Sequence, residues 1–166
     1  MKRTFLGLIV TFGLVLVAQA STVITKSPGA CNGNWSMCQN AFGSDDTYSV
    51  GPAPAIGNWY NYGFSISATT TASTTVEVGV EAKVTERCSD SNIMSIAVSQ
   101  NTGVTYGPAH NVSLTCTDAT TWIDVTRDFP TWDATTLADS RFRVRAQCVS
   151  GAYCDLDWLP VRVTIP

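Results

Sequence analysis

The chain has 166 residues, 45% of them hydrophobic, and carries a formal net charge of −3 at pH 7. This length supports one domain with its own hydrophobic core. The charge is acidic and no run of basic residues is present, so we expect neither nucleic acid nor an anionic membrane surface as a partner. Valine exceeds leucine, and serine and threonine are abundant, which favours strands over helices.

The first 20 residues have the pattern of a secretory signal peptide. Lys2 and Arg3 form a positive start, residues 5–17 are an apolar run, and residues 18–20 (AQA) form a small-x-small cleavage site. The apolar run is too short to span a bilayer comfortably, and no second run follows. We therefore predict a secreted protein, extracellular or at the cell surface. Its mature part, residues 21–166, is expected to be a single domain without a membrane span.

The first predicted strand follows the cleavage site directly, within residues 21–27. Its strand-forming residues are Thr22, Val23, Ile24 and Thr25. Residues 28–29 (PG) separate it from the rest of the chain. Such a strand either pairs within its own sheet or is donated to a neighbouring copy, and donation from head to tail produces a filament. The sequence leaves both arrangements open.

Residues 27–58 are rich in Gly, Pro, Asn, Ser and Asp, which is typical of loops and turns. Asp45 and Asp46 in this segment offer carboxylate oxygens, the ligand type that Ca²⁺ prefers. The ordered ligand spacing of a calcium-binding loop is absent, and Asp side chains also stabilise ordinary turns. We therefore expect no cofactor, with calcium at Asp45 and Asp46 as the alternative.

Strand-like segments then follow at short, regular intervals. Residues 74–85 alternate strictly, with valine or alanine on one side and mainly charged residues on the other, as expected for a strand with one buried face. The other predicted strands are 59–67, 93–99, 110–116, 120–126, 141–148 and 154–165. No segment has a convincing helical period, although 132–140 has room for one short turn.

The last two predicted strands, 141–148 and 154–165, are expected to form an antiparallel hairpin. If Cys148 faces Cys154, the apolar residues of the two strands lie on one face. The resulting apolar pairs are Ala146 with Leu156, Val144 with Trp158, and Phe142 with Pro160. The same register pairs Gln147 with Asp155 and Arg145 with Asp157, the latter as an ion pair. A bulge near Pro160 is expected, because the apolar positions change face beyond it.

All six cysteines lie in the predicted mature part: Cys31, Cys38, Cys88, Cys116, Cys148 and Cys154. An even number in a secreted chain predicts three disulfides, with Cys148–Cys154 the pair that the hairpin selects. A zinc site is not expected, because the cysteine spacings are wide and His110 is the single histidine. About eight short strands with turn signals between them predict an all-β fold, a two-sheet antiparallel jelly-roll β-sandwich stapled by disulfides.

Five segments resemble the jelly-roll β-sandwich domains of secreted bacterial and archaeal cell-surface proteins. They are residues 40–48 (NAFGSDDTY), 62–66 (YGFSI), 76–78 (VEV), 142–145 (FRVR) and 156–163 (LDWLPVRV). The resemblance covers most of residues 40–165, and the six cysteines depart from the usual pattern. Similar sandwiches are subunits of archaeal extracellular filaments, such as threads and bundling pili, in which a strand of one subunit completes the next. The resemblance therefore implies a structural role and self-association, and it brings no catalytic residues.

No pair of residues meets both the spacing and the pKa requirements of a catalytic site. His110 is not accompanied by a Gly-x-Ser-x-Gly elbow. Asp155 and Asp157 have the separation of two glycosidase carboxylates, but an arginine partner would lower the pKa of Asp157 and so disqualify it as the acid. Glu77 and Glu81 share a strand face but lie too far apart. We therefore predict that the protein is not an enzyme.

Aromatic residues suggest a second kind of function, glycan binding. The candidates for stacking against a sugar ring are Trp35, Trp59, Tyr60, Tyr62 and Tyr106, and the first three are favoured. In the other interpretation, alternate members of the Trp59–Tyr62 run face the core. We predict a secreted, non-enzymatic structural or adhesive protein, in its most concrete form a filament subunit that polymerises through strand exchange. The alternative is a carbohydrate-binding module that binds cell-surface glycans.

Overall fold

The computed structural model describes residues 21–66, 74–85, 88, 92–150 and 153–166, and the predicted signal peptide lies outside this part. The described chain is all-β, as predicted, and its strands are short. They are β1 (Thr22–Lys26), β2 (Ala30–Gly33), β3 (Ser49–Pro52), β4 (Ile56–Tyr60), β5 (Thr75–Lys83), β6 (Asn92–Ser99), β7 (His110–Leu114), β8 (Ala119–Asp124), β9 (Arg143–Ser150), β10 (Tyr153–Trp158) and β11 (Val161–Ile165). Two 3₁₀ turns, η1 (Cys38–Ala41) and η2 (Thr126–Asp128), lie between strands. No described helix is long and apolar enough to cross a membrane.

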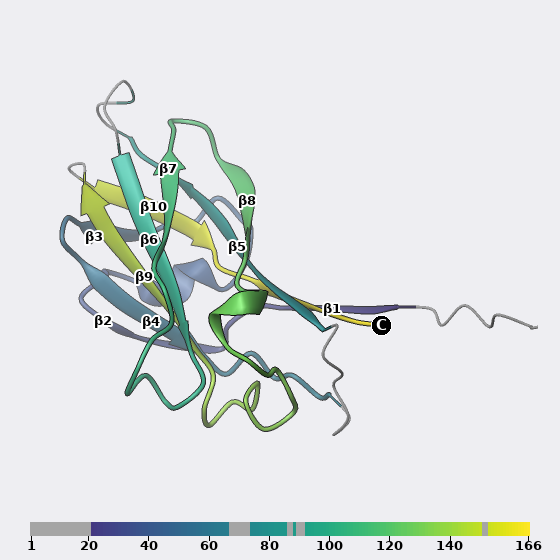
Figure 1. Cartoon of the computed structure of the whole chain (residues 1–166). Helices are drawn as coiled ribbons and strands as arrows, with labels where there is room; N and C mark the ends of the chain where they lie inside the picture. Colours follow the sequence, from purple (N-terminus) through teal and green to yellow (C-terminus); the bar gives the residue numbers. More distant parts are fainter. Residues whose placement is uncertain (1–20, 67–73, 86–87, 89–91, 151–152) are drawn as a thin grey trace, which may run out of the picture.

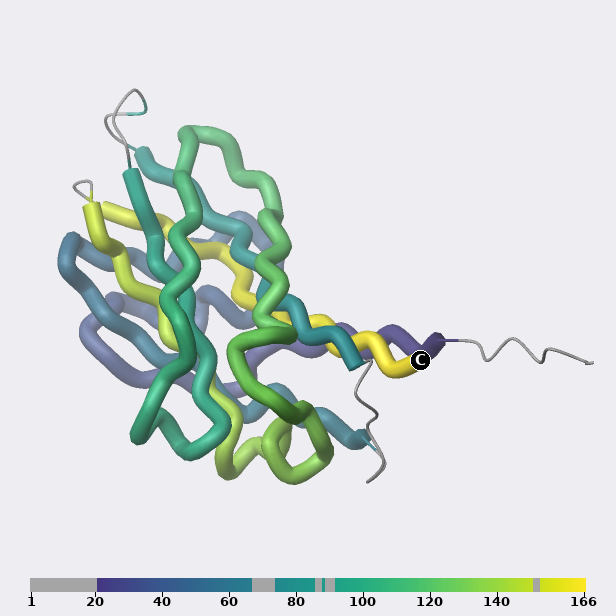
Figure 2. Tube along the Cα trace, viewed as in Figure 1, coloured from purple at the N-terminus to yellow at the C-terminus, as the bar shows by residue number. Residues whose placement is uncertain are grey.

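The strands form two antiparallel sheets packed face to face, which confirms the predicted sandwich (Figure 1). The first sheet has the order β1-β11-β5-β10-β3, and β8 pairs with the other side of β5. The second sheet has the order β2-β4-β9-β6-β7. Figure 2 shows β1 and β11 side by side at the end of the first sheet, where β11 also pairs with β5. Strands distant in sequence are thus neighbours in both sheets.

Strict alternation in β5 places its apolar side chains between the two sheets. Val76, Val78 and Val80 are at most 1% exposed, as the period-two pattern predicts. From the second sheet, β6 and β9 contribute Ile96 and Val144, both fully buried. Burying one such side chain stabilises the fold by about 1.5–3 kcal/mol, so this layer is the main stabilising element of the sandwich.

The predicted hairpin of the last two long strands is wrong. β9 lies in the second sheet between β4 and β6, whereas β10 lies in the first sheet between β3 and β5. Cys148 and Cys154 nevertheless form a disulfide, because both point inward and meet across the sandwich. Arg145 and Asp157 point out of opposite sheets, so the predicted ion pair does not form. Inward-facing residues of two packed sheets produce the same alternation as one face of a hairpin, which is why the sequence pattern misled.

A break near Pro160 occurs as predicted. The register of β10 against β5 shifts between Leu156 and Trp158. The chain then continues as β11, which also pairs with β5. The amide of Gly79 donates to the Pro160 carbonyl oxygen at 2.8 Å. A Cβ at position 79 would lie 2.7 Å from Pro160 Cγ, so only glycine permits this close approach. The long strand β5 therefore pairs with two successive shorter strands, β10 and β11.

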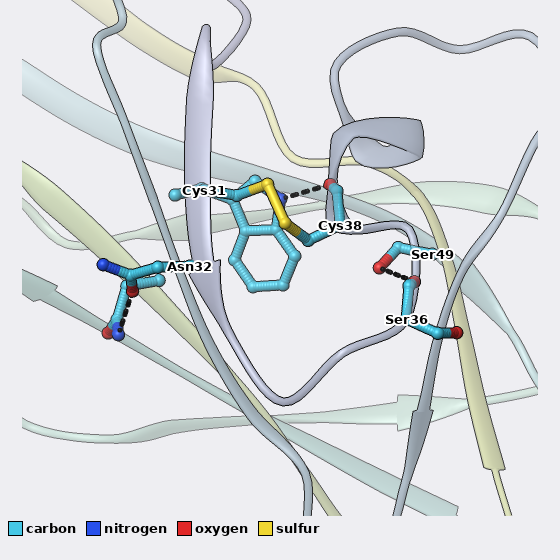
Figure 3. The surroundings of a disulfide bond; sticks show 7 residues. Cys31, Asn32, Ser36, Cys38 and Ser49 are labelled. Carbon is cyan, nitrogen blue, oxygen red and sulfur yellow. Dashed lines mark hydrogen bonds between the residues drawn. A yellow bond between two sulfur atoms is a disulfide. The ribbon is translucent and has the colours of Figure 1, made fainter.

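All six cysteines are paired, as predicted: Cys31–Cys38, Cys88–Cys116 and Cys148–Cys154. Figure 3 shows the first pair, which ties β2 to η1. The indole nitrogen of Trp59 donates to the Cys38 carbonyl oxygen at 3.0 Å, which links a core side chain to one cysteine of this pair. Three disulfides indicate an oxidising compartment, in agreement with the predicted secretion.

Candidate functional site

The outer face of the second sheet presents polar and aromatic side chains from β2, β4, β9 and the β6–β7 loop. On β9, Val144 and Ala146 are buried, so the alternate residues Arg143, Arg145 and Gln147 face outward. On β4, Asn58 and Tyr60 alternate in the same way with buried Gly57 and Trp59. We call this surface the arginine–tyrosine face and define it by Asn32, Asn58, Tyr60, Tyr106, Arg143, Arg145 and Gln147.

A chain of contacts crosses the arginine–tyrosine face from the loop to β2. The guanidinium carbon of Arg145 lies 4.1 Å from the centre of the Tyr106 ring. The Tyr106 hydroxyl donates to Asn58 Oδ1 at 2.6 Å, and Asn58 Nδ2 donates to Asn32 Oδ1 at 3.0 Å. Burial raises the pKa of the Tyr106 hydroxyl, although Arg145 and Arg143 oppose this shift, so the hydroxyl stays a donor at neutral pH. Asn32, the last residue in this series of contacts, is exposed. Figure 3 shows it beside Cys31 on β2.

The two arginines of the face differ in what their N–H groups contact. Arg143 stacks on Tyr60 at 4.2 Å, and its Nη1 donates to the carbonyl oxygens of Asp139 and Phe142, both at 2.8 Å. Arg145 stacks on Tyr106 but donates no hydrogen bond to any residue that the structure describes. The ion pairs among the described residues are His110–Asp128 and Arg162–Glu77, so neither outward arginine of β9 has a carboxylate partner there.

A well-connected loop holds Tyr106 in place between β6 and β7. Asn101 Nδ2 donates to Thr105 Oγ1 at 2.8 Å, and the Thr105 amide donates back to Asn101 Oδ1 at 2.9 Å. The Gly107 amide donates to the Val98 carbonyl oxygen at 2.9 Å, which closes the loop against β6. Gly103 has φ +82°, and a Cβ there would lie 2.9 Å from the Tyr106 hydroxyl oxygen. The position of Tyr106 therefore depends on a glycine in the left-handed region.

The structure separates the predicted sugar-stacking residues into two groups. Tyr60 and Tyr106 lie on the arginine–tyrosine face. Trp35 and Trp59 are 5% and 0% exposed and pack edge to face in the core, with ring centres 5.6 Å apart. Tyr62 is also buried, and its hydroxyl donates to a carbonyl oxygen. The prediction of stacking by Trp35 and Trp59 is therefore corrected, because a ring enclosed by the core cannot contact a sugar.

Sequence reasoning missed the outward arginines of β9. It placed Arg145 in an ion pair with Asp157, a partner that the structure puts on the opposite sheet. A signal was present, since Arg143, Arg145 and Gln147 occupy alternate positions with apolar residues between them. That pattern indicates a row of donors on one strand face. Asn32 and Asn58 carried no such signal, because only the strand register brings them together.

The predicted calcium candidates have different environments. Asp45 Oδ1 accepts from the Thr47 amide at 3.1 Å, as in an ordinary Asp-stabilised turn. Asp46 belongs to a cluster with Asp118 and Asp157, in which one carboxylate oxygen from each residue lies within 4.8 Å of the others. Oδ1 of Asp118 is buried without a hydrogen-bond partner in the described structure. An all-oxygen donor set of this kind suits Ca²⁺ chemically.

Burial raises the pKa of Asp157, which is 1% exposed. The backbone amides of Asp46 and Asp45 donate to its carboxylate and oppose the shift, whereas the charges of Asp118 and Glu81 reinforce it. Repulsion among acidic groups is therefore built into this part of the first sheet.

The donor-strand candidates Thr22, Val23, Ile24 and Thr25 form most of β1. This strand pairs with β11 of the same chain, with Thr22 opposite Ile165 and Lys26 opposite Val161. β1 lies at the end of the first sheet, and Val23 is 56% exposed.

A hollow of about 280 Å³ opens where β7 and β8 leave the gap between the sheets. Its lining is aliphatic or hydroxylated: Val80, Ala82, Val112, Ser113, Leu114, Thr115, Thr117, Ala119 and Thr121. These residues include no charged or aromatic side chain. His110, at the start of β7, contacts Asp128 instead, with its Nε2 atom 2.9 Å from Oδ2 of the carboxylate.

No family model matches the chain, and no curated protein matches it. The chain is similar to a solved family 32 carbohydrate-binding module from C. perfringens NanJ in complex with galactose, with 10% identity and a TM-score of 0.44 over 86% of this chain and 93% of that one. It is also similar to CBM29_1, a family 29 carbohydrate-binding module from Piromyces equi, with 10% identity and a TM-score of 0.40 over 87% and 91% of the two chains. At these values the similarity is confined to the β-sandwich arrangement.

Proposed function

We propose that the protein is a secreted, non-enzymatic glycan-binding domain whose binding surface is the arginine–tyrosine face. The observation that carries this proposal is the environment of Arg145, which is stacked on Tyr106 and free of described hydrogen-bond acceptors. Sugars offer many hydroxyl and ring oxygens, which accept hydrogen bonds from guanidinium and amide groups. The partly buried rings of Tyr60 and Tyr106 add apolar surface for contact with a sugar ring.

The rigidity of the face supports the same proposal. Stacking and hydrogen bonds fix Tyr60, Tyr106, Arg143 and Asn58 before any ligand arrives. A ligand therefore meets side chains that lose little rotamer freedom on binding, which lowers the entropic cost of association. The hollow between β7 and β8 lacks such convergent charged and aromatic groups, and we do not assign it a glycan.

Affinity electrophoresis of the mature domain in gels containing soluble polysaccharides tests the proposal. We expect retardation by at least one polysaccharide and its loss in Tyr106→Ala, because that change removes both the ring under Arg145 and the donor to Asn58. Tyr153→Ala is the matched control, since Tyr153 is 48% exposed on β10 in the other sheet. Unchanged retardation of Tyr106→Ala, or no retardation of the unmodified domain by any polysaccharide, would contradict the proposal.

A filament subunit remains the second candidate, favoured by the exposed edge strand β1 and its residue Val23. Its pairing with β11 would have to open and re-form on a neighbouring copy, which preserves the same contacts and therefore costs little free energy. Electron microscopy and size-exclusion chromatography of the mature protein test this candidate. Regular fibres that disappear when residues 21–27 are deleted would support it, whereas a monomer at all concentrations would oppose it.

A further inference from the structure

The arginine–tyrosine face combines positive charge with an absence of described acidic partners. Arg143 and Arg145 lie two residues apart on one strand, about 7 Å along it. They point to the same side, and neither forms an ion pair with a described residue. The whole chain is acidic, with 13 acidic against 10 basic residues. An excess of basic residues therefore does not explain why these two arginines have no carboxylate partner among the described residues.

The way in which Arg145 is held leaves its hydrogen-bond donors available. The guanidinium carbon of Arg145 lies over the Tyr106 ring, and none of its N–H groups donates to a residue that the structure describes. The N–H groups of a guanidinium lie in its plane, so contact with a ring leaves them free for another partner. The edge of a guanidinium matches the two oxygens of a carboxylate and binds them with two parallel hydrogen bonds. Arg143 differs, because two backbone carbonyls already accept from its Nη1. Arg145 is thus the better placed of the two to bind an anion.

The neighbours of Arg145 are donors as well. Gln147 occupies the next outward position on β9 and makes no side-chain hydrogen bond to a described residue. Asn32 accepts from Asn58 through its oxygen, which leaves its amide N–H groups facing solvent. Asp139 contacts the face through its backbone carbonyl, which accepts from Arg143, and its carboxylate accepts from the Gly63 amide at 2.7 Å. A ligand carboxylate on this face therefore meets amide N–H donors beside the positive charge of Arg145.

We infer that the arginine–tyrosine face selects acidic glycans, in particular polyuronates, and that Arg145 binds a uronate carboxylate. This inference rests on the proposed glycan-binding function and names its ligand class. Charge complementarity singles out carboxylate-bearing sugars from neutral ones, since a neutral hydroxyl accepts a weaker hydrogen bond from a guanidinium than a carboxylate does.

Isothermal titration with a hexamer of galacturonate and with the same hexamer methyl-esterified tests the inference. The two probes share every sugar ring and differ in the charge of the carboxyl groups. We expect the mature domain to bind the acid at least about tenfold more tightly than the ester, the difference expected for one charge-assisted contact. This preference should diminish as sodium chloride is raised, because salt screens partly exposed charges.

Variants of Arg145 locate the preference. Arg145→Gln should reduce the acid-to-ester ratio to near one, and Arg145→Lys should keep part of it, because lysine retains the charge but not the planar fork. Arg127→Gln removes one exposed positive charge from η2 and should leave the ratio unchanged. Circular dichroism of each variant checks that the fold is intact.

Two results would overturn the inference and remain distinguishable. Equal affinity for acid and ester, or an unchanged ratio in folded Arg145→Gln, would refute acidic-glycan selection while leaving glycan binding in place. Failure to bind either hexamer, together with no retardation by any polysaccharide, would refute the proposed function itself.

Discussion

Gly103 shows how one residue without a side chain controls the geometry of the arginine–tyrosine face. Its positive φ shapes the loop, and its missing Cβ leaves room for the Tyr106 hydroxyl. That hydroxyl in turn donates to Asn58, and the ring below it supports Arg145. The placement of the proposed carboxylate-binding group therefore depends on a residue that touches no ligand.

We predict that Gly103→Ala weakens glycan binding and destabilises the domain. The left-handed backbone costs about 1–2 kcal/mol for an alanine, and the new Cβ would displace Tyr106. Urea unfolding measures the stability, and affinity electrophoresis measures the binding. Gly43→Ala is the control, because nothing lies within 4 Å of a Cβ there. Equal effects of the two substitutions would show that the loop tolerates a side chain beside Tyr106.

Two buried carboxyl groups give the stability of the domain an unusual dependence on pH. Burial raises the pKa of Asp155 and of Asp157 above 3.8 in the folded state. The folded protein therefore binds these protons more tightly than the unfolded chain does. Their contribution to the free energy of unfolding should increase as pH falls from neutral through the raised pKa values. Below 3.8 it is fully present, while Asp124 and Asp133, whose pKa values are lowered, lose their contributions.

Urea unfolding at pH values between 7 and 4 tests this dependence. We expect the difference in stability between the natural protein and Asp157→Asn to change in favour of the natural protein as pH falls, since only the natural protein gains from protonation at this position. Asp124→Asn is the control of opposite sign, because hydrogen bonds from Thr126 lower the pKa of Asp124 in the folded state, and its stability difference should change in the opposite direction as pH falls. A pH-independent difference for Asp157→Asn would contradict the prediction.

The Asp46, Asp118 and Asp157 cluster makes calcium the natural ion to test. If Ca²⁺ binds there, it neutralises the repulsion among the three carboxylates and stabilises the folded state by mass action. Thermal unfolding should then show a higher Tm in millimolar CaCl₂ than in EDTA, and Asp118→Asn should abolish the rise. An equal Tm in both buffers would mean that Ca²⁺ does not bind there and that backbone amides alone offset the repulsion among the three carboxylates.

At the scale of elements, the disulfides connect the structure in different ways. Cys148–Cys154 joins β9 to β10 and so joins the two sheets, with both residues fully buried. Cys31–Cys38 joins β2 to η1 at the margin of the core and is partly exposed. Their sequence separations, 6 and 7, are nearly equal. The chain-entropy effect of the two bonds is therefore similar, and differences between them report on packing.

We predict that replacing Cys148 and Cys154 by alanine destabilises the domain more than replacing Cys31 and Cys38. Loss of either bond removes about 2–4 kcal/mol in the chain-entropy model, but only the core pair also leaves a cavity between the sheets. Free energies of unfolding in urea compare the two double variants. Equal losses would indicate that the sheets repack around the smaller side chains.

The elements also show what the sequence predicts and what it does not. Alternation identified β5 and β9 as strands and identified their buried residues, because side-chain direction is a local property of the chain. It did not identify the partner of β9, because pairing depends on contacts far away in sequence. The inward direction of Cys148 was therefore predicted correctly while its sheet was not. The arginine–tyrosine face was predicted only in part, through Tyr60 and Tyr106, for the same reason.

At the scale of the whole molecule, composition was the most informative property. Abundant valine, threonine and serine, six cysteines and turn residues at short intervals predict a disulfide-stapled β-sandwich, and the structure confirms it. The composition says nothing about where unpaired charge is exposed. That property arises only when two sheets close on each other and leave one outward strand face lined by arginines.

The pairing of β1 with β11 has a mechanical consequence. Thr22 lies opposite Ile165, so the outer ends of the two strands lie together at the tip of the same antiparallel ribbon (Figure 2). A force that separates these ends acts across the strands and breaks their hydrogen bonds one after another, rather than shearing them all at once. β1 precedes Cys31, so no disulfide restrains it. Under tension β1 therefore separates from β11 progressively from this end, while the disulfide-linked sandwich keeps its shape.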